Sequence, residues 1–468
     1  MLFLTEIILT FLLLAILISG MCLRQVQQGQ YGFAMSCISL ILIIIYLMIQ
    51  PIHHQSIPGW TVDSLSQYMK LFATIASLYI MITSRSTIKQ LSIKTFEFYV
   101  LLLASLLGVF VVASAKNFLV LFVGLELIAL PLYAMIALFN KRQAYEAALK
   151  YFILGAMASG ILLFGIALMF GINGHIDFMF SNISDNIDIK LKMLAVLLIL
   201  IGLLMKLGFA PFHYWVPDVF EGAPIPMVML IATLPKFAYV SAIMRLSFEG
   251  MLSISILPNV IVVLSLLSIL IGNLGALSQT SLKRLLGYSS IAHMGFMLLA
   301  LNPGVQNFVP IFYLIMYTIT SILVFSNTMF LSKGNELDEM ISYQGLYEKQ
   351  PLFAMMYLIS FFSLAGIPPL GGFMAKLNVF YILLTQAENS TWLYTAATLA
   401  MLFAVIGTAY YIRFIRIIYF ESQNKTQYQR LSSSQTILLV IPASLILLFG
   451  ILPGLLIEIS QNAILITS

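Results

Sequence analysis

Five lysines and one glutamate lie inside long apolar runs of the sequence: Lys70, Lys150, Lys206, Lys236, Lys376 and Glu126. A charge at the centre of a bilayer costs about 2.5–3.5 kcal/mol on insertion scales, so such residues are usually functional. Burial disfavours the charged form of a side chain, whereas a nearby opposite charge favours it. A lysine beside Glu126 should hold its proton, and the same lysine without that partner should release it more readily. This set therefore indicates proton transfer between buried groups.

The choice of lysine over arginine fits this chemistry, because arginine stays protonated in proteins. Some of these residues have simpler interpretations. A lysine near a helix end can extend its ammonium to the membrane interface, which is what we expect of Lys70 and what stays open for Lys150 and Lys206. Glu126 could also be a static ion-pair partner that only fixes helix packing.

Two histidines are further candidates for proton transfer, because histidine titrates near neutral pH. His213 lies in Phe-His-Tyr-Trp at 212–215, and His293 lies within an apolar run at 285–302. The alternative is a structural hydrogen bond: His213 would anchor a loop, and His293 would be a satisfied core residue.

The elements that must position these residues are membrane helices. Of 468 residues, 61% are hydrophobic and 9% are charged, whereas soluble domains are about 25% charged. The apolar runs are continuous and about 18–25 residues long, as a membrane-spanning helix requires. We expect one all-α integral membrane domain over residues 1–468. Its fourteen apolar segments are 2–20, 32–50, 65–83, 97–114, 118–139, 146–171, 191–209, 223–247, 257–278, 285–302, 308–332, 351–386, 391–419 and 434–457.

Lysine and arginine positions predict the orientation. Fourteen basic residues fall at odd-numbered loops and four at even-numbered loops. Because basic residues favour the cytoplasmic side, odd loops are cytoplasmic and both termini lie on the other side. The net charge of +5 is scattered over short loops without a basic face, so we expect no nucleic-acid partner.

One segment is too long for a single simple crossing. Segment 351–386 contains Gly-Ile-Pro-Pro-Leu-Gly-Gly at 366–372, and its two prolines disrupt a regular helix. A discontinuous helix is predicted there. Segment 223–247 shows a weaker version of the pattern, with Pro224 and Pro226 at its start and Pro235 before Lys236. Paired broken helices in two halves of a membrane protein indicate inverted repeats and an ion path.

Four stretches together resemble the antiporter-like membrane subunits of respiratory complex I, the proton-pumping NADH:quinone oxidoreductase. They are 146–156, 206–218 (which begins Lys-Leu-Gly-Phe-Ala-Pro-Phe-His), 283–293 and 363–373. Among these subunits the resemblance is greatest to the subunit N type. Subunit M has glutamate at the position of Lys376, and subunit L carries a C-terminal extension.

The resemblance implies about fourteen helices with two inverted five-helix repeats, discontinuous helices 7 and 12, and an antiporter-like core of helices 4–13. It implies that Glu126 and Lys206 are an interacting pair and that Lys236 is the central lysine. It gives Lys376 as the terminal residue of the path, with Lys150 and His293 as the helix-six lysine and helix-ten histidine. Residues 172–190 are expected to lie off the proton path.

The same resemblance implies a translocase of the bacterial inner membrane, embedded in lipid among other complex I membrane subunits. The chain has no flavin, iron–sulfur or haem signature, so NADH, flavin, iron–sulfur clusters and quinone are expected in partner subunits. Three alternatives stay open: a subunit of a multi-subunit Na⁺/H⁺ antiporter of the Mrp type, a membrane subunit of a hydrogenase, and a spacer that conducts nothing. Neighbouring genes would separate the first of these from complex I.

Overall fold

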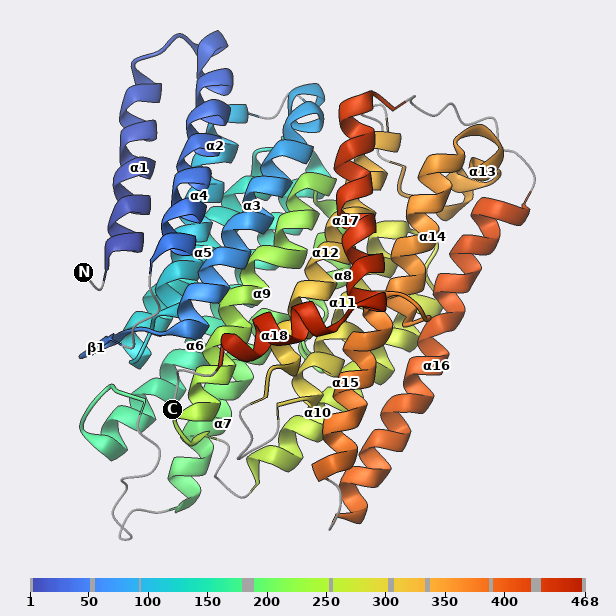
Figure 1. The fold of residues 1–468 in the computed structure, drawn as a ribbon. Coiled ribbons are helices and arrows are strands. Elements are labelled where there is room, and N and C mark those ends of the chain that lie inside the picture. The colour runs from blue at the N-terminus through green and yellow to red at the C-terminus, as the bar shows by residue number, and fades with distance from the viewer. Residues whose placement is uncertain are drawn as a thin grey trace.

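The computed structural model is a bundle of helices with roughly parallel axes (Figure 1). It describes residues 3–50, 55–91, 94–178, 189–251, 256–301, 307–332, 337–386, 390–421 and 431–464. Eleven helices in these ranges are long and apolar enough to cross a membrane. Helices satisfy their own backbone hydrogen bonds, which the hydrocarbon cannot do. The predicted all-α membrane fold is confirmed.

The first half of the chain forms the following elements: α1 (Leu4–Met21), α2 (Gln25–Ile49), β1 (Gln55–Ile57), β2 (Trp60–Val62), α3 (Ser64–Gln90), α4 (Thr95–Ala113), α5 (Phe118–Ala137), α6 (Arg142–Asn173), α7 (Ile189–Leu207), α8 (Trp215–Gly222) and α9 (Ile225–Phe248). The second half forms α10 (Leu257–Leu277), α11 (Leu282–Leu299), α12 (Val309–Leu331), η2 (Met340–Tyr343), α13 (Leu346–Lys349), α14 (Pro351–Ala365), α15 (Gly371–Gln386), α16 (Thr391–Phe420), α17 (Ser433–Ile451) and α18 (Gly454–Asn462). The two strands pair as one antiparallel hairpin.

Twelve of the fourteen predicted apolar segments coincide with one helix each. Segment 351–386 is divided between α14 and α15, and segment 434–457 covers α17 and the start of α18. The number of membrane crossings stays a prediction, since eleven helices meet the length and composition of a span. Of the expected off-path stretch 172–190, residues 179–188 lie outside the described residues.

Two helices are interrupted in the same way. α7 is followed directly by Gly208, with φ 81°, and α14 by Gly366, with φ 82°. Glycine adopts this left-handed conformation without steric cost, which is why it commonly terminates a helix. Proline follows each glycine within three residues, at Pro211 and Pro368. The predicted break in segment 351–386 is confirmed.

The suggestion of a second break in segment 223–247 is wrong. α9 runs without interruption from Ile225 to Phe248 with Pro235 inside it. In the first half the interruption lies one helix earlier, between α7 and α8. A single internal proline is tolerated in a membrane helix when its neighbours satisfy the freed backbone groups. α9 has such neighbours, because nearly all of it is buried.

The two interruptions fall at corresponding places in two five-helix repeats. The first repeat is α4, α5, α6, α7 with α8, and α9; the second is α10, α11, α12, α14 with α15, and α16. Five crossings reverse the direction of the chain, so the second repeat is inverted with respect to the first. α9 and α12 contact each other and are almost entirely buried. Helices that are apolar all round belong to the core.

Close backbone contact between helices depends on glycine in both repeats. A Cβ added to Gly272 of α10 would lie 2.6 Å from the backbone nitrogen of Ala292 in α11, and one added to Gly124 of α5 would lie 3.0 Å from that of Val112 in α4. Without a hydrophobic driving force inside lipid, small residues at such contacts allow the backbones to approach and pack.

Gly272→Ala should therefore destabilise the fold. The added methyl group forces α10 and α11 apart, and overpacking of this kind costs about 1–3 kcal/mol. We expect a lower thermal unfolding midpoint and less assembled protein in detergent-solubilised membranes. Gly160→Ala is the matched control, because no atom lies within 4 Å of its added Cβ. Equal midpoints for the two variants would contradict this interpretation of the contact.

Candidate functional site

Glu126 and Lys206 form an ion pair between helices α5 and α7. Lys206 Nζ lies 2.9 Å from Glu126 Oε1, and the hydroxyl of Ser159 in α6 donates to the same oxygen. The Lys206 side chain is 3% exposed and that of Glu126 is 26% exposed. Lys206 is in the last turn of α7, where the helix dipole favours a positive charge. The break after Leu207 thus leaves this lysine at a helix end inside the protein.

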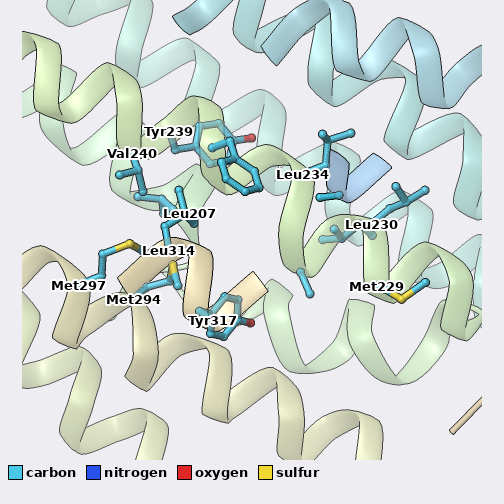
Figure 2. Close-up of a cluster of buried hydrophobic side chains, with 14 of the residues drawn as sticks. Leu207, Met229, Leu230, Leu234, Tyr239, Val240, Met294, Met297, Leu314 and Tyr317 are labelled. Atoms are coloured by element: carbon cyan, nitrogen blue, oxygen red, sulfur yellow. The ribbon is translucent and has the colours of Figure 1, made fainter. Parts of the chain in front are cut away.

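Lys206 and Lys236 line a common cavity of about 10 Å³, which is room for about one water molecule. Lys236, midway along α9, donates to the hydroxyls of Ser290 in α11, at 2.7 Å, and Tyr317 in α12, at 2.8 Å. Figure 2 labels Leu207, Tyr317 and Tyr239, the last of these from α9 itself, in one cluster of buried hydrophobic side chains. An otherwise apolar core therefore holds a polar connection from α7 to α12.

The interruption of the second repeat supplies the contacts of Lys376. Its Nζ donates to the backbone oxygens of Leu364, at 2.8 Å, and Ala365, at 2.9 Å. The last carbonyls of a helix have no partner within it, and ending α14 at Ala365 makes these two available. Leu364 also lines a second cavity of about 10 Å³, together with Tyr317 and His293. Tyr317 thus lies between Lys236 and the cavity that adjoins the Lys376 site.

His293 lies at this second cavity with both ring nitrogens bonded. Nδ1 is 2.8 Å from the hydroxyl of Tyr313, and Nε2 is 3.1 Å from that of Tyr411. A neutral imidazole donates from one nitrogen and accepts at the other, so the two tyrosines complete a hydroxyl–imidazole–hydroxyl series. Tyr313, Tyr317 and Tyr411 were not identified from the sequence. In the sequence each of these residues is a tyrosine within an apolar run, and such a tyrosine most often serves only packing.

Lys150 and His213 lie apart from the row of buried charged side chains formed by Glu126, Lys206, Lys236 and Lys376. Lys150 is 42% exposed and pairs with Glu146, at 2.8 Å, and Asp218, at 2.9 Å. His213 is buried between α7 and α8 with its ring stacked on that of Tyr214. Its Nδ1 has no hydrogen-bond partner within the described part of the chain. Lys150 and His213 thus flank the interruption of the first repeat. Of the other six candidates, Glu126, Lys206, Lys236 and Lys376 form one buried row with His293 beside it, and Lys70 lies elsewhere.

The ion pairs of Lys150 belong to an open polar cavity of about 240 Å³, which we name the vestibule; its charged lining residues are Glu146, Lys150, Asp218, Glu221, Arg284 and Asp338. Arg284 lies 2.8 Å from Asp218 and 2.7 Å from Glu221. Asp218 and Glu221 are on one face of α8, whereas Trp215 and Phe220 of the same helix line the Lys206–Lys236 cavity. α8 therefore separates the vestibule from the buried lysines.

Lys70 does not extend to the membrane interface, so that expectation is wrong. Its side chain is 2% exposed and forms an ion pair with Glu6 of α1, whose side chain is 8% exposed. A lysine that extends to the interface keeps its ammonium in water, whereas the ammonium of Lys70 is enclosed beside a carboxylate. The partner lies 64 positions earlier in the sequence, where nothing in the local pattern indicates it.

The chain is similar to several known proteins. The family described as "NADH:quinone oxidoreductase/Mrp antiporter, TM" matches residues 115–404. The NADH-quinone oxidoreductase subunit N of Coxiella burnetii is 36% identical over 98% of this chain and 97% of that protein. That of Thiobacillus denitrificans is 37% identical over 86% of this chain and 84% of that protein.

Solved structures agree. A chain of respiratory complex I from Thermus thermophilus matches with a TM-score of 0.84 and 32% identity, covering 97% of this chain and 98% of that one. A chain of the Mrp complex from Dietzia sp. shares the fold, with a TM-score of 0.84 and 19% identity over 98% of this chain and 96% of that one. On these similarities, the chain belongs to the NADH:quinone oxidoreductase/Mrp antiporter family of membrane subunits, among the relatives of subunit N.

Proposed function

We propose that this chain is a proton-translocating membrane subunit of a NADH:quinone oxidoreductase. The observation that carries this function is the buried row of Glu126, Lys206, Lys236 and Lys376, in which two small cavities and the hydroxyl of Tyr317 fill the intervals. The subunit N of Coxiella burnetii is similar over 98% of the chain. In this function the subunit is a translocase, and electron transfer takes place on NADH, flavin, iron–sulfur clusters and quinone held by partner subunits.

The charges of the row give a mechanism. While Glu126 neutralises Lys206, the ammonium of Lys206 does not repel a proton on Lys236. When the pair separates, the positive charge of Lys206 moves toward Lys236. The proton affinity of Lys236 then falls, because like charges in a low dielectric repel strongly. Tyr317 receives the proton from Lys236 Nζ and passes its own hydroxyl proton toward the second cavity. Lys376 can then take it up.

The direction of transfer follows from the orientation. With both termini on the non-cytoplasmic side of the bacterial inner membrane, α9 begins on the cytoplasmic side. Lys236 is then about 16 Å along this helix, near the middle of the bilayer. The vestibule at the start of α6 and α11 opens to the cytoplasm. Protons enter there, pass α8, and reach Lys206 and Lys236. Lys150 and His213, which flank this entrance, act at the uptake step.

A purification of the tagged chain from its native membranes tests this function. We expect NADH dehydrogenase and quinone-reducing subunits to co-purify with it. After reconstitution in vesicles, NADH and a quinone should drive a proton gradient without added sodium. The outcome that would overturn the proposal is a complex without NADH oxidation in which a sodium gradient drives proton movement. That outcome is the one expected of a Mrp-type antiporter subunit. A hydrogen-oxidising complex would contradict it equally.

A further inference from the structure

A second buried acid–lysine pair lies outside the row. Glu6 of α1 and Lys70 of α3 are in contact, with side chains 8% and 2% exposed. Lys70 Nζ also lies 3.3 Å from the hydroxyl of Thr5, and the hydroxyl of Ser114 lies 3.5 Å from Glu6 Oε1. Tyr46 of α2 interacts electrostatically with Glu6. The pair has the same composition as Glu126 and Lys206, a carboxylate and an ammonium with a hydroxyl donor beside the carboxylate.

This pair adjoins a second ion pair that involves α9. Arg245 Nη1 lies 2.8 Å from Asp63 Oδ2, and Arg245 Nη2 donates to the backbone oxygen of Ala113 at 2.8 Å. Ala113 immediately precedes Ser114, which contacts Glu6. Asp63 caps the start of α3, two helical turns before Lys70. The two ion pairs therefore contact the adjacent residues Ala113 and Ser114 at the end of α4. We refer to these four charged side chains as the cluster; they come from α1, the start of α3 and the end of α9, the helix that carries Lys236.

Within the cluster, two members keep a fixed charge. Arginine remains protonated in proteins. Burial raises the pKa of Asp63, but the Arg245 guanidinium and the hydrogen bonds from Ser66 outweigh this and hold that pKa at about 2. Glu6 and Lys70, in contrast, contact each other and neighbouring hydroxyl groups, and within the described residues neither contacts a guanidinium.

We propose that Glu6 and Lys70 form a second proton-exchanging pair, on the side of the membrane where the chain begins, coupled to Lys236 through Arg245 and α9. This inference rests on the proposed function. A proton that reaches Glu6 forms one O–H bond on its carboxylate and removes the attraction for Lys70. It leaves by breaking the same bond, so the step needs no oxidant or reductant. Because the termini lie on the non-cytoplasmic side, the pair acts where protons are released.

The test uses Lys70→Arg in the complete complex, reconstituted in vesicles. Arginine keeps the charge and the hydrogen bonds, so assembly should match the wild type. Because arginine does not give up its proton, the pumping rate should fall at least about fivefold, which corresponds to about 1 kcal/mol on the barrier. Infrared difference spectra during turnover should contain a protonated-carboxyl band that Glu6→Gln lacks. A structural pair predicts no such band.

If the single variants assemble poorly, proton pumping is measured in a double variant, Glu6→Leu with Lys70→Met. Replacing both partners of a buried pair by apolar residues is often neutral for stability. If the double variant or Lys70→Arg pumps at the wild-type rate, the pair only fastens α1 to α3 and the inference is wrong. Lys236→Ala, measured alongside, separates the two proposals. If Lys236→Ala stops pumping while the Lys70 variants do not, only this inference fails.

Discussion

Lys236→Ala should stop proton pumping while the complex remains assembled. Its ammonium is the only charged group between the Lys206 cavity and Tyr317 within the described residues, where it contacts Ser290 and Tyr317. Alanine leaves both hydroxyls without the proton donor between them. We expect NADH oxidation with a quinone acceptor and the resulting proton gradient to fall together, at least about tenfold, or about 1.4 kcal/mol.

The control for this variant is Lys89→Ala, a lysine exposed near the end of α3. It should oxidise NADH and pump at the wild-type rate. The amount of assembled complex is measured by native gel for both variants before their rates are compared. Unchanged NADH oxidation and pumping in an assembled Lys236→Ala complex would remove the central residue from the mechanism. The buried row would then be a packing feature.

Removing one partner of the Glu126–Lys206 pair should cost more than removing both. In Glu126→Ala, Lys206 is left with 3% of its side chain exposed and no counter-charge. Breaking a buried pair in this way costs about 3–5 kcal/mol, and the partial exposure of Glu126 places the expected value near the lower bound. The thermal midpoint and the yield of assembled complex should both drop.

The double variant Glu126→Gln with Lys206→Met should recover assembly, because it leaves no unpaired buried charge. It should not recover proton pumping, because it also removes the ion pair whose separation changes the proton affinity of Lys236. Glu97→Gln, at the partly exposed start of α4, is the control for loss of a carboxylate. A double variant that pumps normally would show that the pair only holds α5 against α7. A double variant as unstable as Glu126→Ala would contradict the unpaired-charge explanation.

The fold was predictable wherever its cause is local in the sequence. A run of apolar residues has the length of a helix, and the two prolines at 368 and 369 interrupt one, so segment 351–386 was correctly divided. The interruption after Gly208 was less evident, because the apolar run continues to residue 209 and the eight-residue α8 has no apolar run of its own. Pro235 misled for the opposite reason, since buried neighbours preserve the helix around it.

The site was predictable in its residue types and less so in its contacts. A lysine anywhere in a membrane segment is a candidate functional residue. Lys206, Lys236 and Lys376 were all identified in this way. The partner of Lys70, Glu6, is in α1, two helices earlier, and the two side chains meet because α1 and α3 both pack against α2 and α4. The tyrosines around His293 come from α12 and α16. Only the packing of α11, α12 and α16 within the second repeat brings the hydroxyls of Tyr313 and Tyr411 to one imidazole.

The position of α8 has an electrical consequence. The vestibule brings water and ions to one face of this two-turn helix, and the lysine cavity is on its other face. A conducting solution carries little voltage drop, so the potential across the membrane falls over the sealed part of the protein. A helix is about 10 Å across, against about 30 Å of hydrocarbon. The transmembrane voltage, worth about 2.3 kcal/mol per charge at 100 mV, therefore falls over α8 and the sealed protein beyond it, which holds the buried lysines.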